Sequence, residues 1–111
     1  MSVISDMLPS DAAEQAEIER ILREQPDLAA MIETAQAKAR EVFAEPRFSL
    51  DTHGYDDWDP PLRLVVRADV PEEKFDATFL GYIHWLGAEP GIDLDRLSID
   101  PLLHAVAGSR Q

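Results

Sequence analysis

The densest group of chemically active side chains lies between residues 51 and 59. It holds four aspartates and one histidine: Asp51, His53, Asp56, Asp57 and Asp59. Carboxylate oxygens at this density are typical ligands of Mg²⁺ or Ca²⁺. In a strand, Asp51 and His53 would also share one face, where they could begin a metal site. One hypothesis is therefore a small-ligand-binding or metal-dependent enzyme that uses these residues.

The same segment supports two other interpretations. It does not match a calcium-binding loop, because no glutamate closes it and Gly54 is misplaced. We therefore predict no bound metal and no cofactor, and the simplest reading is a solvated acidic turn. Aromatic side chains nevertheless stand among the acids, and exposed aromatics are enriched at binding hot spots. The predicted partner-binding loop consists of Tyr55, Asp56, Asp57, Trp58 and Asp59.

Three arginines form a second candidate site. Alternation in the flanking segments places Arg47, Arg63 and Arg67 on one face of a predicted strand pair. Together they could clamp an anionic ligand. The alternative is that they pair with acids across the strands. Elsewhere no Gly-x-Ser-x-Gly motif and no glycine-rich phosphate loop occurs, so we assign no catalytic residue.

The elements that position these residues follow from the hydrophobic spacing, which predicts an α+β fold. We predict a single domain, 1–111, in which residues 1–9 form a loose lead-in. Two N-terminal helices form a hairpin. Two strands pair antiparallel in a small sheet, and a third helix packs on that sheet. A short third strand and a last helical turn follow, the latter because Asp100-Pro101 fits a cap and first helical residue. The predicted ranges are 11–25 and 26–44 for the hairpin, 47–53 and 62–70 for the strand pair, 71–87 for the third helix, 97–99 for the third strand and 101–108 for the last turn.

The third helix carries the last candidate surface. Residues 77–88 contain no Asp, Glu, Lys or Arg. A helix that is apolar nearly all round is usually buried on more than one side. The first two helices could cover this side, or a partner could. For the second case we predict a homodimer interface at Ala77, Leu80, Gly81, His84 and Trp85.

Charge and composition narrow the function classes. The formal net charge is −12, from 22 acids against 10 lysines and arginines, and the acids are spread along the chain. Such a surface repels phosphate, so we expect no direct nucleic-acid binding and favour a basic protein partner, although solubility alone could explain the acidity. No stretch approaches the ~20 apolar residues of a membrane span. There is no cysteine, and the first eight residues lack a signal-peptide pattern, so we predict a cytoplasmic protein.

Part of the chain resembles short bacterial proteins of unassigned function, some of them antitoxin-like members of small gene pairs. The resemblance covers about residues 43–86 and is carried by Phe43-Ala44-Glu45-Pro46-Arg47-Phe48-Ser49-Leu50-Asp51, Leu64-Val65-Val66 and Pro71-Glu72-Glu73-Lys74-Phe75. The run 81–86 departs from the acidic and aromatic residues that such proteins carry late in the third helix. The resemblance brings no catalytic residues. The acidity of the chain, the loop with Tyr55 and Trp58 and the uncharged run 77–88 together predict a non-enzymatic protein-interaction module, an antitoxin-like partner that neutralises a basic protein.

Overall fold

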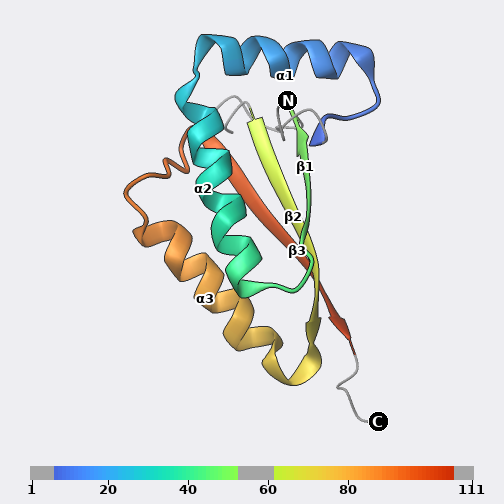
Figure 1. The fold of residues 1–111 in the computed structure, drawn as a ribbon, viewed down its shortest axis with the longest axis vertical. Helices are drawn as coiled ribbons and strands as arrows, with labels where there is room; N and C mark the ends of the chain where they lie inside the picture. Colours follow the sequence, from blue (N-terminus) through green and yellow to red (C-terminus); the bar gives the residue numbers. More distant parts are fainter. Residues whose placement is uncertain (1–6, 53–61, 107–111) are drawn as a thin grey trace.

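The structure is a computed structural model that describes residues 7–52 and 62–106. In these ranges the chain forms three α-helices, one short 3-10 turn and three strands, which confirms the predicted α+β class. Figure 1 shows their arrangement. In chain order they are α1 (Ala12–Glu24), α2 (Asp27–Val42), β1 (Arg47–Asp51), β2 (Leu62–Pro71), the turn η2 (Glu72–Lys74), α3 (Phe75–Ala88) and β3 (Leu97–Val106).

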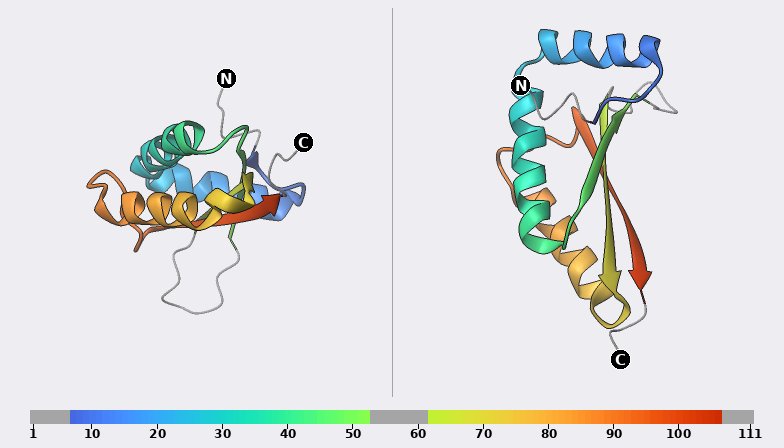
Figure 2. Two further views of the ribbon diagram at one scale, coloured as in Figure 1. Left: turned by 90° about the horizontal axis from the view of Figure 1, so that it is seen from below. Right: turned by 45° about the vertical axis from the view of Figure 1, so that its right-hand side comes forward.

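The first two helices form the predicted hairpin. The Asp11 carboxylate caps α1 by accepting a hydrogen bond of 3.1 Å from the Glu14 amide. Pro26 then separates α1 from α2. In Figures 1 and 2, α1 lies across one end of the sheet, whereas α2 runs along a sheet face beside α3. The Glu14 side chain fixes α1 there, because its Oε2 accepts a hydrogen bond of 2.9 Å from the Thr52 amide at the end of β1.

The sheet has the order β1-β2-β3 and is mixed. β1 and β2 pair antiparallel, as the sequence predicts, and the register places Arg47 opposite Arg67 and Asp51 opposite Arg63. β3 pairs parallel to β2, so the prediction of an antiparallel sheet is wrong for this strand. The reason is the crossover through α3, which returns the chain to the end of the sheet where β2 begins.

The last element also differs from the prediction. The predicted helical turn over residues 101–108 is wrong in its described part, because β3 continues from Leu97 to Val106. Asp100 and Pro101 lie inside this strand. Proline is tolerated there because β3 is an edge strand, whose outward backbone groups need no partner in the sheet. The predicted third strand, 97–99, is therefore only the first part of a longer one.

The core lies between the inner face of the sheet and the helices. Alternate side chains of β2 are buried along its whole length: Leu62, Leu64, Val66, Ala68 and Val70. The apolar stripe of α2 faces them, with Leu28, Ile32, Ala35 and Ala39 fully buried. α3 contributes Tyr82 and Leu86. Among the described residues, no helix is long and apolar enough to span a bilayer.

Candidate functional site

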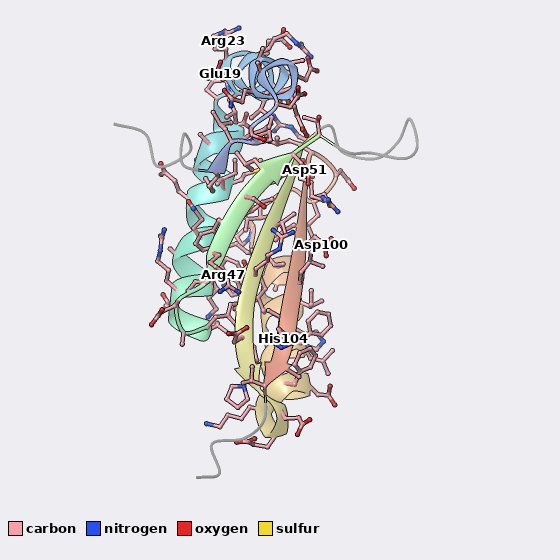
Figure 3. The ribbon with its side chains drawn as sticks, turned by 90° about the vertical axis from the view of Figure 1, so that its right-hand side faces the viewer. Glu19, Arg23, Arg47, Asp51, Asp100 and His104 are labelled. Carbon is pink, nitrogen blue, oxygen red and sulfur yellow. The ribbon has the colours of Figure 1, made fainter. Side chains whose placement is uncertain are left out.

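The outer face of the sheet carries the predicted arginines together. In the β1–β2 register, Arg47 lies opposite Arg67 and Arg63 lies opposite Asp51, so all three arginines project from the face that the helices leave uncovered. Figure 3 shows Arg47, Asp51, Asp100 and His104 distributed along the strands of this sheet. The strands also bring three aspartates to this face: Asp51, Asp69 and Asp100.

Arg63 is the centre of this face. Its Nε and Nη2 donate hydrogen bonds of 3.0 and 2.8 Å to the two carboxylate oxygens of Asp51, and its Nη1 donates one of 3.2 Å to Asp100. Such a bidentate pair is among the stronger hydrogen-bonded contacts in proteins. An anion that bound Arg63 would have to displace two carboxylates, which makes this guanidinium a connector of the three strands.

The other two arginines have weaker partners. Arg67 Nη1 donates a hydrogen bond of 3.1 Å to the Ser49 hydroxyl, and Arg47 Nη2 lies 3.9 Å from Asp69 Oδ1. Both arginines are exposed. The geometry thus follows the cross-strand pairing considered as the alternative to anion binding.

Sequence reasoning missed the contribution of β3 to this face. Ser98, Asp100, Leu102 and His104 share the outer side, because they lie beside Arg63, Val65, Arg67 and Asp69 of β2. The sequence does indicate a strand here, because these outer residues alternate with the apolar residues Leu97, Ile99 and Leu103. This indication was hidden by Asp100-Pro101, which also fits the start of a helix.

The acidic segment lies mostly outside the described residues. This applies to His53 and to the predicted loop Tyr55, Asp56, Asp57, Trp58 and Asp59. Asp51 is described, and both its oxygens accept hydrogen bonds from Arg63. Within residues 7–52 and 62–106, no three His, Asp or Glu side chains form a group that could hold a metal ion.

The outward face of α3 is the second candidate surface. Ala77, Leu80, Gly81 and His84 are all exposed, so the helical hairpin does not cover them. The Leu80 side chain is 54 % exposed. Gly81 stands in the middle of the helix, where glycine costs about 1 kcal/mol relative to alanine. A Cβ added at Gly81 would meet nothing within 4 Å, so packing inside the chain does not require this glycine.

Trp85 differs from the other four residues predicted with it. It is half-buried on the side of α3 that faces α2, where its ring stacks on Tyr82. The ammonium of Lys38 from α2 lies 5.7 Å from the centroid of the Trp85 ring, a cation–π distance. Trp85 therefore joins two helices and forms the margin of the α3 face.

Acidic residues stand at both ends of the α3 face. Glu72, Glu73 and Asp76 lie at its start, where Lys74 is the only base among them. Glu89, Asp93 and Asp95 follow its end. None of these six acids forms an ion pair within the described part of the chain. The acids after the helix stand beside its negative C-terminal end, so this region attracts a positive group.

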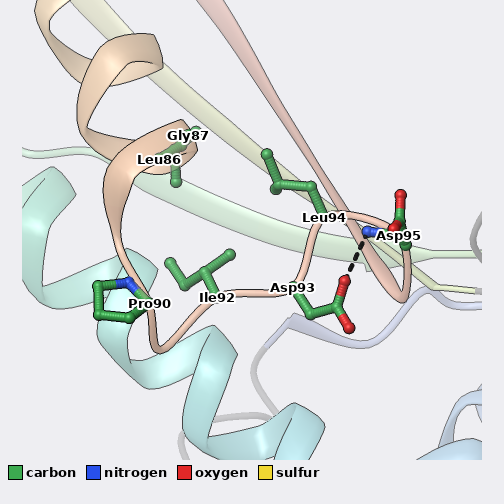
Figure 4. Close-up of a pocket in the computed structure, with 7 residues that line it drawn as sticks. All are labelled: Leu86, Gly87, Pro90, Ile92, Asp93, Leu94 and Asp95. Atoms are coloured by element: carbon green, nitrogen blue, oxygen red, sulfur yellow. Dashed lines mark hydrogen bonds between the residues drawn. The ribbon is translucent and has the colours of Figure 1, made fainter.

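A hollow of about 400 Å³ opens at the end of α3 (Figure 4). Its apolar wall includes Leu86, Ile92 and Leu94, and its polar part holds Asp93 and Asp95. The Asp95 amide donates a hydrogen bond of 3.0 Å to Asp93 Oδ1, which fixes the turn. An apolar wall beside carboxylates suits a lysine or arginine side chain, whose stem is apolar and whose head is charged.

Comparison of the chain with models of known protein families, with curated proteins and with solved structures gives no match.

Proposed function

We propose that the protein is a non-enzymatic acidic interaction module of the cytoplasm, an antitoxin-like partner of a basic protein. The observation that carries the proposal is the outward face of α3. This face contains the exposed Leu80 and the unpacked Gly81 and carries no charged residue. At both of its ends stand acids that form no ion pair with other described residues. An apolar centre with a polar rim is the usual composition of a protein-binding surface.

The acids at the ends of α3 favour a basic partner over a second copy of the chain at this face. If two copies packed their α3 helices side by side, whether parallel or antiparallel, an acidic end of one helix would lie beside an acidic end of the other. Like charges held together in this way oppose association. A basic partner meets attraction at the same places, so we assign this face to a basic partner. The predicted homodimer is part of the proposal but needs another surface.

The proposal is tested by affinity purification of the tagged full chain from its native host, followed by mass spectrometry. We expect a small basic protein to co-purify with the unmodified chain and to be lost with Leu80→Glu, which puts a charge in the centre of the face. The matched control is Ala37→Glu, which puts the same charge at an exposed position of α2 outside this face. If no basic protein co-purifies, or if both variants retain it equally, the proposal fails.

A further inference from the structure

Within residues 7–52 and 62–106, the outer edge of β3 has no strand partner along its ten residues. β3 is the last strand of the order β1-β2-β3, and no described residue pairs with its other side. β1, the opposite edge, is only five residues long. A long edge strand presents unpaired amides and carbonyls to any strand that can join it, and proteins normally protect such edges.

The apolar side chains on the inner face of the sheet are also only partly covered at this edge. Every inner side chain of β2 is buried, but exposure rises along β3 from Leu97, which is fully buried, through half-buried Ile99 and Leu103 to exposed Ala105. Ile83 of α3 lies on the flank away from Trp85 and is half-buried too. The core margin therefore ends at β3 with apolar side chains that a further strand would cover.

We propose that a second copy of this chain occupies the edge, with the two β3 strands antiparallel about a two-fold axis at Leu102. Opposite residues of an antiparallel pair share a face. In this register Leu102 meets the partner's Leu102, and the inner-face residue Ala105 lies opposite the partner's Ile99. On the outer face, His104 lies opposite the partner's Asp100, and the symmetry repeats this pair.

Charge complementarity selects a second copy over another occupant. The three strands carry three arginines and three aspartates, so the sheet is neutral before His104 is counted, although the whole chain has a net charge of −12. The sheet edge is therefore a place where two copies approach without the repulsion of the acidic helices. The two His104–Asp100 contacts add attraction when the imidazole is charged and a hydrogen bond when it is neutral.

Pro101 has to fit this arrangement. A proline in an edge strand places its nitrogen away from the sheet, so each Pro101 would offer no amide to the partner strand. Its carbonyl can still accept from the partner's Leu103. The pairs of Ile99 with the partner's Ala105 keep both ladder hydrogen bonds, and there are two such pairs. The proline therefore weakens the centre of the joint without preventing it.

The inference gives the proposed homodimer its surface and is independent of the basic partner at α3. The test is the mass of the full chain by light scattering and sedimentation. We expect twice the chain mass of 12.4 kDa at about 100 μM. His104→Asp turns both cross-strand contacts repulsive and should raise the dimer dissociation constant on the order of tenfold. His104→Lys, which places a positive charge opposite the partner's Asp100, should leave the constant unchanged or lower it.

The matched control is His84→Asp, which makes the same charge change on the exposed face of α3. It should leave the dimer intact, and circular dichroism should show that all three variants are folded. A monomeric unmodified chain at 100 μM would overturn the inference, as would a dimer that His84→Asp breaks and His104→Asp does not. Co-purification of the basic partner is measured separately, so a lost dimer with a retained partner contradicts only this inference.

Discussion

The Tyr82 hydroxyl of α3 donates a hydrogen bond of 3.1 Å to the carbonyl oxygen of Ala35 in α2. Both residues are fully buried, and the Tyr82 ring also meets the edge of Phe43, with 5.2 Å between ring centroids. Burial raises the pKa of the Tyr82 hydroxyl above its ordinary value of 10.0, so the group remains a donor in mildly alkaline buffer. This contact fixes the rotation of α3 and hence the direction of its outward face.

We expect Tyr82→Phe to lower the free energy of unfolding by about 1 kcal/mol, because it removes one buried hydrogen bond and keeps the ring. Tyr82→Ala should cost about 3 kcal/mol or more, because it also leaves a cavity. Urea unfolding followed by circular dichroism measures both values. Equal stability of Tyr82→Phe and the unmodified chain would contradict the role given to the hydroxyl.

Asp27 should make stability depend on acid pH. Arg96 Nη2 donates a hydrogen bond of 2.9 Å to Asp27 Oδ1, and this contact lowers the pKa of Asp27 below its ordinary value of 3.8. A carboxyl whose pKa is lower in the folded state stabilises the fold above its unfolded pKa and loses this contribution as pH falls through the folded pKa. Asp27→Asn should therefore be less stable than the unmodified chain near neutral pH, and the difference should shrink below about pH 4.

The measurement is the urea midpoint of both proteins across the acid range. The control is Glu33→Gln, which changes an exposed acid of the same helix that has no ion pair within residues 7–52 and 62–106. Glu33→Gln should leave the midpoint nearly unchanged at every pH. A difference between Asp27→Asn and the unmodified chain that persists undiminished in acid would show that the ion pair does not cause it.

Gly81→Ala should separate stability from binding. A Cβ at this position meets open space, so the change should raise the free energy of unfolding by about 0.5–1 kcal/mol. Gly87→Ala also meets open space and serves as the control for the gain in stability. If the basic partner approaches the helix closely at Gly81, the stabilised Gly81→Ala chain should bind it more weakly. Unaltered binding would exclude a close approach there.

Arg63→Met should destabilise the fold by about 1–2 kcal/mol, because it leaves Asp51 and Asp100 without their shared partner. Arg67→Met should have a smaller effect, since among the described residues the Arg67 side chain donates one hydrogen bond, to Ser49. Arg63→Lys should fall between them, because an ammonium cannot reproduce the planar fork that meets both oxygens of Asp51. Denaturant unfolding ranks the three variants, and equal losses for Arg63→Met and Arg67→Met would contradict the central role of Arg63.

The acidic loop should act on binding in two separable ways. Replacing Asp56, Asp57 and Asp59 with Asn should mainly lower the association rate with the basic partner and its salt dependence. Trp58→Ala should mainly raise the dissociation rate and cost on the order of 2 kcal/mol if the indole is a hot spot. Surface plasmon resonance at several salt concentrations measures both effects. If the partner binds both variants as tightly as the original, these five residues are not the recognition loop.

The parts of the fold that follow from local pattern were predictable. The alternation of Leu62, Leu64 and Val66 gave β2 and its faces, and it placed Arg63 beside Asp51 through the hairpin. Asp100 was not predictable in the same way, because it reaches Arg63 from 37 positions away, on a strand whose pairing is not local. The residues next to Asp100 favour the start of a helix. Pairing of this segment with the edge of β2 outweighs that local preference.

The candidate surfaces likewise have one part that the sequence predicts and another that only the fold determines. The absence of charge on residues 77–88 is a property of the sequence, and it identified the α3 face. Which of its residues are exposed depends on α2: Tyr82 and Trp85 turn toward that helix, and Leu80 and Gly81 turn away. The edge of β3 could not be seen at all while its second half was assigned to a helix.

The parallel pairing of β2 with β3 has a consequence for the order in which the chain folds. Every pair of this ladder joins residues 35 positions apart, from Leu62 with Leu97 to Pro71 with Val106. The intervening segment must lose its freedom before the first pair of this ladder forms, whereas the helical hairpin and the β1–β2 pairing join residues that are closer in sequence. We therefore expect β3 to dock last and to set the folding rate. Until it docks, the growing nucleus exposes the edge of β2, which makes this interval the moment of greatest risk for aggregation.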